Sequence, residues 1–339
     1  MEVSPLSNDE LNEILFRVQD VRVAVVGDFC LDAYWNIDLG KSEPSLETGK
    51  PTRTVSHQAY SLGGAGNVVH NMVTIGCGEV CALGVVGDDP WGRELIRLLG
   101  QRGVDTLDLL VQSDNWSTLV YAKPCVKDDE QERIDFGRHN QLSQDTATAL
   151  IDRVGARLDS VDIVVVNQQV REGIHDPAFR KGLLNLVREN AEKTFIVDSR
   201  HYSESYLGSW LKVNDVEAGR LCTGGHGAAD AVHGEDAITS AATLYDRGDC
   251  PVFVTRGGRG LVVCDENGTC EIPGVQAKGE VDTVGAGDSM LAGIALALAA
   301  KADATAAAQF GNLVAAVTVQ KIRQTGTATP SEIRKIDSC

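Results

Sequence analysis

The segment from Asp282 to Ser289 contains the residue types best suited to catalysis. Its sequence, DTVGAGDS, directly precedes an apolar stretch, Met290 to Ala300, that is expected to form a helix. Small residues at 285 to 287 would let backbone N–H groups approach an anion closely, and a helix N-terminus adds free donors and a positive dipole end. Asp288 in the first turn could cap the helix or accept a proton from an attacking hydroxyl. The spacing alone favours the cap.

Two other glycine-rich loops follow or precede regular elements. Residues 255 to 260, TRGGRG, follow an apolar strand and suit contact with phosphate or ribose through backbone N–H groups. Residues 62 to 67, LGGAGN, lead into a predicted helix and could hold polyol hydroxyls. Taken alone, each loop is explained as well by an ordinary turn. Neither is a Walker A loop, and no G-x-G-x-x-G follows a strand, which disfavours a dehydrogenase.

Composition and charge restrict the class of partner. The 339 residues carry a formal net charge of -17. This acidic balance argues against nucleic acid, which is bound by clustered Lys and Arg, but it does not exclude small anionic substrates. Nine scattered cysteines without a C-x-x-C pair indicate reduced thiols. The polar N-terminus and the lack of an apolar run near ~20 residues predict a cytoplasmic protein without a membrane segment.

The alternation of apolar runs and helical patterns predicts an α/β fold. Strands are expected at Val23–Val26, Cys81–Val86, Ile163–Val166, Phe195–Val197 and Val252–Thr255, and helices at Leu11–Val18, Gly66–Ile75, Trp91–Leu99, Pro177–Asn190 and Glu235–Tyr245. Such alternation is typical of a mostly parallel sheet with helices on both faces. We expect residues 1–339 to form a single domain.

Two stretches interrupt this alternation. Residues 34–60 and 117–137 have strand-like polar alternation without helices, and we expect them to form a small β-sheet lid inserted into the main fold. Residues 262–272 predict a hairpin that turns at Asn267-Gly268, because this dipeptide favours tight turns.

Four motifs together resemble the ribokinase-like (PfkB) carbohydrate kinases over nearly the whole chain. The motifs occur in the order found in that family: Gly63, Gly64 and Asn67 in the first signature; Asn214 and Glu217 in N-x-x-E; Thr255, Gly257 and Gly260 in the nucleotide loop; and residues 282–289 in the second signature, D-T-x-G-A-G-D. The resemblance implies a three-layer α/β/α fold and ATP-dependent phosphorylation of a sugar hydroxyl. It also implies a homodimer joined through the lid.

The resemblance assigns a role to each matching position. Asp288 is similar to the catalytic base, and the backbone of Gly285, Ala286 and Gly287 to the anion hole. The other roles implied are sugar binding by Asp32, Gly63, Gly64 and Asn67; nucleotide binding by Asn214, Thr255, Gly257, Gly260 and Asn312; Mg²⁺ held by Asn214 and Glu217 through water; and a monovalent cation such as K⁺ held by Asp282 and the loop at Gly326, as in some members.

Within that family the chain is most similar to the D-glycero-β-D-manno-heptose-7-phosphate kinases. Residues 25–35 match their V-G-D-x-x-L-D-R-Y-W start, although Ala33 replaces its Arg, and residues 131–136 match a segment ending in R-x-D-F. The stretch 167–171, NQQVR, replaces S-D-Y-x-K, so the subfamily's acidic residue is absent at Gln168. This departure leaves the identity of the sugar open.

Two arginines keep positive charge where that subfamily has lysine. Arg171 and Arg200 each follow a predicted strand, and an Arg can hold a phosphate with two donors. We therefore predict that they clamp a phosphate at the far end of the sugar. The alternatives are that both are solvated surface residues, that the enzyme phosphorylates an unphosphorylated sugar or a nucleoside, or that the chain is a non-catalytic sensor of a sugar or nucleotide.

Overall fold

A long, mostly parallel sheet forms the centre of the molecule. The computed structural model describes residues 4–127, 129–223, 234–277, 279–322 and 326–337. In that part of the chain the main sheet has the order β14-β13-β12-β11-β10-β9-β1-β4-β5. The strands from β12 to β5 are parallel, and β13 and β14 add an antiparallel hairpin at one edge. Their bounds are β1 Arg22–Gly27, β4 Glu79–Gly87, β5 Asp105–Gln112, β9 Ile163–Gln168, β10 Thr194–Ser199, β11 Trp210–Asn214, β12 Val252–Thr255, β13 Leu261–Asp265 and β14 Gly268–Ile272.

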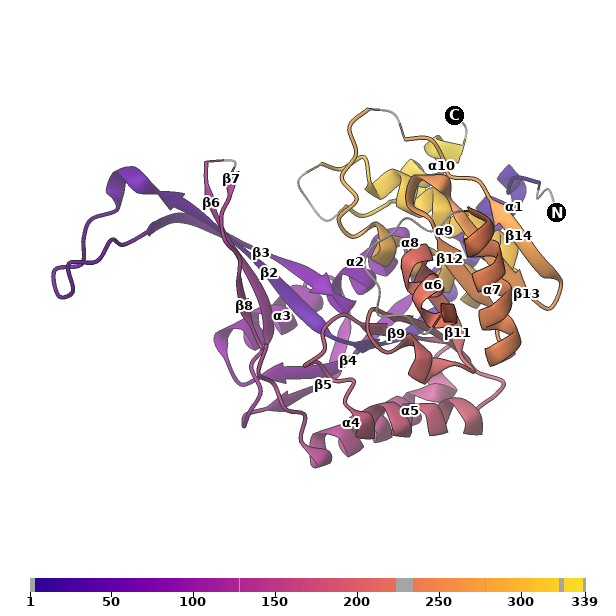
Figure 1. Cartoon of the computed structure of the whole chain (residues 1–339), viewed down its shortest axis with the longest axis horizontal. Helices are drawn as coiled ribbons and strands as arrows, with labels where there is room; N and C mark the ends of the chain where they lie inside the picture. Colours follow the sequence, from indigo (N-terminus) through magenta and orange to yellow (C-terminus); the bar gives the residue numbers. More distant parts are fainter. Residues whose placement is uncertain (1–3, 128, 224–233, 278, 323–325, 338–339) are drawn as a thin grey trace.

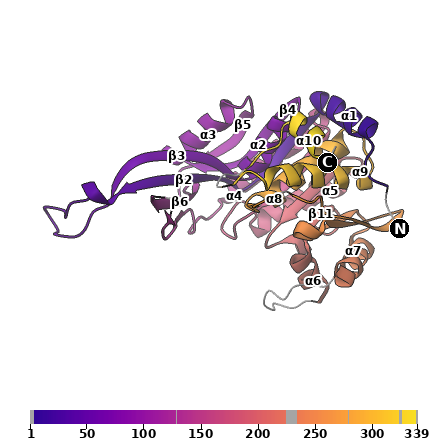
Figure 2. The same ribbon diagram turned by 90° about the horizontal axis from the view of Figure 1, so that it is seen from above.

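Helices cover both faces of this sheet, as the sequence predicts. The core on one face takes side chains from α1 (Asn8–Arg17), α2 (Ala65–Ile75), α3 (Pro90–Gly100), α8 (Ala286–Ala299), α9 (Ala304–Thr318) and α10 (Pro330–Asp337). The core on the other takes them from α4 (Gln144–Arg157), α5 (Pro177–Glu189), α6 (Asp215–Thr223) and α7 (Gly234–Gly248). Figure 2 shows α6 and α7 on the side of the sheet opposite α8 and α9.

The unbroken apolar runs arise from burial on both faces. Along β1, Val23 and Val25 pack into one core while Ala24 and Val26 pack into the other. A strand buried on both sides needs apolar residues at every position. The sequence did not predict β5, β11 or α4, because each alternates apolar with polar or charged residues and so resembles exposed chain.

The second, smaller sheet projects from the body as an arm. It contains β2 (Phe29–Asp38), β3 (Thr54–Gly64), β6 (Leu119–Val126), β7 (Asp129–Glu130) and β8 (Ile134–Phe136). Figures 1 and 2 show β2 and β3 extending together well beyond the layered body. The strands reach further than the expected limits of 34 and 60, because β2 pairs with β3 from Phe29↔Gly64 to Asp38↔Thr54.

An aromatic cluster fixes the base of this arm to the body. The ring of Trp91, in the first turn of α3, lies 6.4, 5.6 and 6.2 Å between centroids from Trp35, Tyr60 and Phe136. The hairpin β13–β14 forms as predicted, with Gly268 at φ 104° where its second strand begins. The cysteines in the described residues are free. None of the helices described is both long and apolar enough to cross a membrane.

Candidate active site

The second signature forms the turn that begins α8. Gly285 is the N-cap residue with φ 78°, a left-handed conformation that favours glycine. The N–H of Ala286 donates to the carbonyl of Thr283, 3.2 Å away. Among the described residues, no acceptor is bonded to the N–H groups of Gly287 and Asp288. The helix N-terminus therefore presents unused donors, as an anion-binding site requires.

Asp288 does not cap its own helix but faces the first signature. The Nδ2 of Asn67, in the first turn of α2, donates to Asp288 Oδ2 at 2.7 Å across 221 positions of sequence. Gly64, just before that helix, has φ 56°, and a Cβ there would lie 2.4 Å from the carbonyl oxygen of Asp28. The two glycine-rich motifs thus meet in one site.

The carboxyl group of Asp288 is tuned toward proton acceptance near neutral pH. The pKa of Asp288 is raised to about 6, with burial as the largest cause. The hydrogen bond from Asn67 opposes the rise, the charge of Asp198 adds to it, and the charges of Lys212 and Arg200 oppose it. A base works best when its pKa lies near the working pH. A carboxyl group with such a shift is a candidate catalytic group.

Asp32 lies beside the first signature on the small sheet. A Cβ on Gly63 would lie 3.0 Å from Asp32 Oδ2. Lys123, from β6, pairs with Asp32 at 3.1 Å and also donates to the hydroxyl of Tyr34 at 3.3 Å. Burial raises the pKa of Asp32 and the charge of Lys123 opposes that rise. Sequence reasoning did not identify Lys123, because the parallel pairing of β2 with β6 is what places it here.

Asp28 shapes the loop that follows β9, a role that sequence reasoning did not predict. Its Oδ2 accepts the N–H groups of Gln169 and Val170 at 2.8 and 3.1 Å, and its Oδ1 accepts that of Ile174 at 2.9 Å. A Cβ on Gly173 would lie 2.0 Å from Asp28 Oδ1, so the loop wraps tightly around the carboxylate. Because Gly27 pairs with Asn167, the two strand ends are adjacent.

Gln168 and Gln169, in the stretch 167–171, have different environments. Gln168 is fully buried and accepts from the hydroxyl of Ser199 at 2.9 Å and the N–H of His201 at 2.8 Å. Gln169 points into the site, where its Nε2 lies 3.3 Å from Asp288 Oδ1 and 3.2 Å from Asn167 Oδ1. The amide at 168 therefore joins two loops, whereas the amide at 169 reaches the carboxyl group of Asp288.

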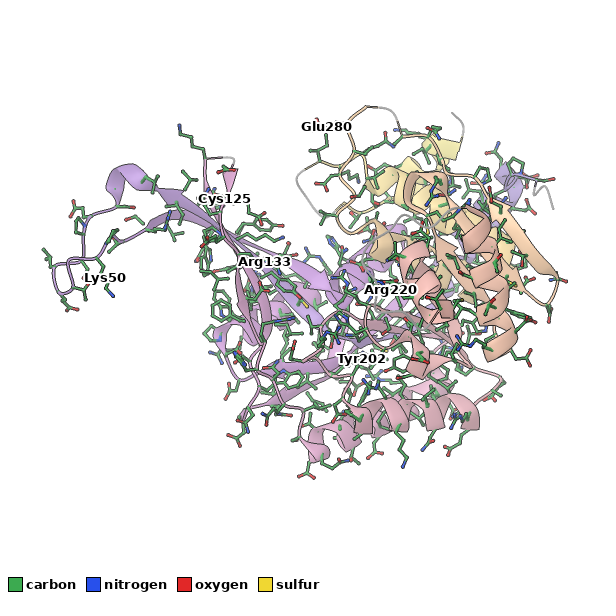
Figure 3. All side chains as sticks on the ribbon, in the orientation of Figure 1. Lys50, Cys125, Arg133, Tyr202, Arg220 and Glu280 are labelled. Atoms are coloured by element: carbon green, nitrogen blue, oxygen red, sulfur yellow. The ribbon has the colours of Figure 1, made fainter. Side chains whose placement is uncertain are left out.

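Arg171 lies on the loop that follows β9, and Arg200 lies on the loop that follows β10. The N–H of Arg200 donates to the carbonyl of Gln168 at 3.1 Å. Burial lowers the pKa of His201, and the positive charges of Arg171 and Arg200 lower it further, so both guanidinium groups act on this imidazole. Both arginines are exposed, and no described carboxylate forms a salt bridge with either. Figure 3 labels Tyr202 on the same loop, whose hydroxyl donates to the carbonyl of Arg171 at 3.2 Å.

Asn214 and Glu217 form a reciprocal cap at the start of α6. The N–H of Glu217 donates to Asn214 Oδ1 at 2.8 Å, and the N–H of Asn214 donates to Glu217 Oε2 at 2.9 Å. This arrangement is a capping box with Asn as its first residue. Burial raises the pKa of Glu217, and the charge of Asp198 raises it further. Glu217 Oε1 has no hydrogen-bond partner in the described chain.

Asn214 and Glu217 fit Mg²⁺ only if most of the ion's ligands come from other groups. No group of three His, Cys, Asp or Glu side chains in the described residues could hold a metal ion. Mg²⁺ commonly keeps several waters and binds through one or two carboxylates plus nucleotide phosphates. The free oxygen of Glu217 suits that arrangement.

A buried lysine that the sequence analysis did not identify lies between these groups. Lys212, on β11, is 5% exposed, and its Nζ donates to Asp198 Oδ2 at 2.8 Å. A Cβ on Gly287 would lie 3.1 Å from the same Nζ. Burial lowers the pKa of Lys212, but the charges of Asp198, Glu217 and Asp288 raise it more. The side chain is therefore cationic. It adjoins the turn at residues 285–287, which is called the anion loop below.

A cavity of roughly 390 Å³ joins the nucleotide loop to the anion loop. Its wall includes Thr255, Gly257, Ala286, Gly287 and Asn312, five of the residues predicted from the sequence. The Nδ2 of Asn312 donates to the carbonyl of Pro273 at 2.8 Å and so holds a neighbouring loop. Gly260 is not in the wall; with φ 88° it supports the turn, where a Cβ would lie 2.1 Å from the carbonyl oxygen of Ile272.

The residues predicted to hold a monovalent cation lie near the end of α9. The N–H of Asp282 donates to the carbonyl of Val319 at 2.8 Å. A Cβ on Gly326 would lie 2.5 Å from the carbonyl oxygen of Thr318. Positions 323–325 of that loop lie outside the described residues.

Solved structures share this fold. Phosphofructokinase-2 from Escherichia coli in complex with potassium is 20% identical, with a TM-score of 0.72 over 94% of this chain and 98% of that one. Ribokinase from Arabidopsis thaliana, complexed with ribose and ATP, is also 20% identical, with a TM-score of 0.70 over 94% of this chain and 99% of that one.

Sequence comparisons identify curated relatives. The bifunctional protein HldE of Pelobacter propionicus is 28% identical over 97% of this chain and 65% of its own length. The protein of the same name from Mesorhizobium japonicum is 30% identical over 97% of this chain and 64% of its own length. The chain thus spans somewhat less than two thirds of these relatives. The family model for pfkB family carbohydrate kinases matches residues 22–333 of this chain. The chain therefore belongs to the pfkB family of carbohydrate kinases.

Proposed function

We propose that this carbohydrate kinase phosphorylates a sugar that already carries a phosphate, with a heptose 7-phosphate as the first candidate. The observation that carries the proposal is the pair Arg171 and Arg200. In a chain of net charge -17, both are exposed on adjoining loops without a carboxylate partner among the described residues. Cations gathered without counter-charges favour an anionic ligand.

Other cations border the same region. Lys123 pairs with Asp32, Arg138 pairs with Glu172 at 3.4 Å, and the guanidinium of Arg133 lies 4.4 Å from the ring centre of Tyr121. Arg133, labelled in Figure 3, directly precedes β8 of the small sheet. Arg133 also pairs with Asp135 at 2.6 Å, so each of these three cations already has a carboxylate partner. Arg171 and Arg200 are therefore the cations that a sugar phosphate would find without a salt-bridge partner in the described chain.

The chemistry follows from the order of the groups. The acceptor hydroxyl, bound near Asn67 and Asp32, gives its proton to Asp288 as its oxygen attacks the γ-phosphorus of ATP. The bond to the bridging oxygen breaks, and its electron pair leaves with ADP. The N–H groups of Gly287 and Asp288 stabilise charge on the transferring group. Phosphoryl transfer depends mainly on such positioning and electrostatics.

The nucleotide occupies the cavity between the two loops in this proposal. Its wall has backbone N–H groups at Gly257 and Gly258 for phosphate or ribose, and apolar surface at Met290, Ala315 and Val319 that suits a flat base. Mg²⁺, bound to the phosphates and through water to Glu217, would neutralise phosphate charge. A monovalent cation such as K⁺ is proposed beside Asp282.

A substrate panel tests the proposal directly. ADP release should be measured with heptose 7-phosphate, fructose 6-phosphate, their unphosphorylated parents, ribose and adenosine. We expect the wild type to prefer a phosphorylated sugar. Preference for an unphosphorylated sugar or nucleoside would replace the proposal with the corresponding kinase.

Removing one arginine tests the phosphate clamp. Each charge-assisted contact contributes roughly 1.5–3 kcal/mol, so Arg171→Ala or Arg200→Ala should lower kcat/KM for the phosphorylated sugar by ~10–100-fold. The KM for ATP should stay nearly constant for Arg171→Ala. Arg188→Ala, an exposed arginine in the last turn of α5, is the matched control. Equal kinetics for all three variants would contradict the clamp.

We further propose that two copies of the chain associate through the arm. Large apolar side chains are exposed along it: Leu39, Leu46, Val55 and Ile134. Exposed apolar groups on a projecting sheet favour burial against a second surface. The sedimentation mass in solution tests this association.

A further inference from the structure

Lys212 has more hydrogen-bonding capacity than its environment uses. An ammonium group has three donors, and the one partner of Lys212 Nζ within the described chain is Asp198 Oδ2. A long charged side chain is rarely buried to this degree unless its donors are satisfied. Two donors of Lys212 Nζ therefore have no acceptor among the described residues and are available to a bound ligand.

The unused donors lie at the anion loop. Lys212 Nζ is 3.1 Å from the position that a Cβ on Gly287 would occupy, and glycine leaves that space open. Gly287 also lines the nucleotide cavity, and Asp288 is its neighbour in the chain. The ammonium group thus lies where the end of a nucleotide triphosphate would meet the base.

The surrounding charges explain why a cation is needed here. Asp198, Glu217 and Asp288 all act on Lys212, and each carboxylate would repel a phosphoryl group. A purely structural ion pair between Lys212 and Asp198 would bury two charges at considerable cost, and replacement by apolar groups is often neutral. Such a pair would not need to place Nζ beside Gly287, where a Cβ would lie 3.1 Å from it.

We propose that Lys212 is a catalytic residue whose Nζ donates to an oxygen of the transferring γ-phosphoryl group, while Asp198 holds the ammonium in place. The proposal rests on the kinase chemistry described above. The acceptor oxygen forms a bond to the γ-phosphorus, the bond to the bridging oxygen breaks, and Asp288 takes the hydroxyl proton. Lys212 keeps its own protons throughout and stabilises negative charge, as other preorganised donors do.

A double variant separates catalysis from structure. Lys212→Met alone leaves Asp198 buried and unpaired, so both explanations predict damage. Asp198→Asn combined with Lys212→Met removes both charges. We expect the ADP Kd and the melting temperature of the double variant to be close to those of the wild type. Its kcat should fall by ~10²–10³-fold, the loss typical of removing one oxyanion donor. Turnover within threefold of wild type would show a structural ion pair and overturn the proposal.

A second measurement does not depend on the variants or on the identity of the sugar. A crystal structure of the wild type with Mg²⁺ and the non-hydrolysable analogue AMP-PNP should place Lys212 Nζ about 2.7–2.9 Å from a γ-phosphate oxygen. A γ-phosphate bound at Gly287 with Nζ beyond hydrogen-bonding distance would overturn the proposal. If the substrate assignment alone is wrong, wild-type ADP release fails with sugar phosphates but this contact remains.

Discussion

The bond between Asn67 and Asp288 should set the pH at which the enzyme becomes active. Asn67 Nδ2 donates to Asp288 Oδ2 at 2.7 Å. The pKa of Asp288 is raised to about 6, mainly by burial, and this bond is the largest effect that opposes the rise. Asn67→Leu keeps the volume of the side chain and removes the donor. The carboxylate form then loses stabilisation while the protonated form loses little, so the pKa of Asp288 should rise.

The size of this rise follows from the strength of the bond. A hydrogen bond to a charged group contributes roughly 1.5–3 kcal/mol, and one pKa unit corresponds to about 1.36 kcal/mol. The pKa should therefore increase by ~1–2 units, to between ~7 and ~8. Because the base acts only when ionised, activity at pH 7 should fall by ~2–10-fold from protonation alone, and the loss should recover at higher pH.

The assay is the pH profile of kcat/KM for the sugar substrate at saturating MgATP. Each profile is scaled to its own alkaline plateau, because Asn67 is also a proposed sugar ligand and its loss lowers the plateau. Gln169→Leu is the matched comparison, since its Nε2 lies farther from Asp288, at 3.3 Å. We expect a smaller shift for it. An acidic limb at the same pH in Asn67→Leu and wild type would refute the assignment of Asp288 as the base.

Three further outcomes are expected. Asp288→Asn should keep its fold and MgATP binding but lose ~10²–10⁴-fold in turnover, and near-normal activity in a preparation free of contaminating kinase would exclude it as base. MgATP at a hundredfold excess over its Kd should stabilise the native state by ~2.7 kcal/mol, measured as a rise in Tm, and no rise at millimolar ATP would contradict the nucleotide cavity. Asp28→Asn should lower the free energy of unfolding by about 1–3 kcal/mol, because its amide would face N–H groups that the carboxylate now accepts, and an unchanged urea midpoint would show that those bonds contribute little.

The sequence by itself determined the fold class and the local conformations of the site. Unbroken runs such as Val23–Val26 indicate strands covered on both faces, and this pattern was enough to predict the layered α/β fold. Glycine at positions 64 and 285 permits the positive φ that these turns adopt, because glycine has no Cβ. The spacing of Asn214 and Glu217 likewise suffices for their capping box, although the sequence analysis assigned both residues to Mg²⁺, and Asn214 also to the nucleotide, without predicting the cap.

Tertiary structure decided which distant groups meet. Asn67 and Asp288 are joined by a hydrogen bond across 221 positions, and Asp28 bonds to a loop more than a hundred residues later. The contacts of Asp28 depend on β9 pairing beside β1, since parallel pairing brings the carboxyl ends of non-consecutive strands to one edge. The bond between Asn67 and Asp288 depends on the packing of α2 against α8. No local pattern records that order.

The same reason explains the lysine beside the anion loop. Lys212 lies in a short strand, WLKVN, where a charged residue in the middle suggests exposed chain. Its burial comes from the neighbouring strands β10 and β12, and its position at Gly287 comes from the way α8 packs at the strand ends. The sequence specifies the type of each side chain, but elements far away along the chain determine the charges and the open space around it.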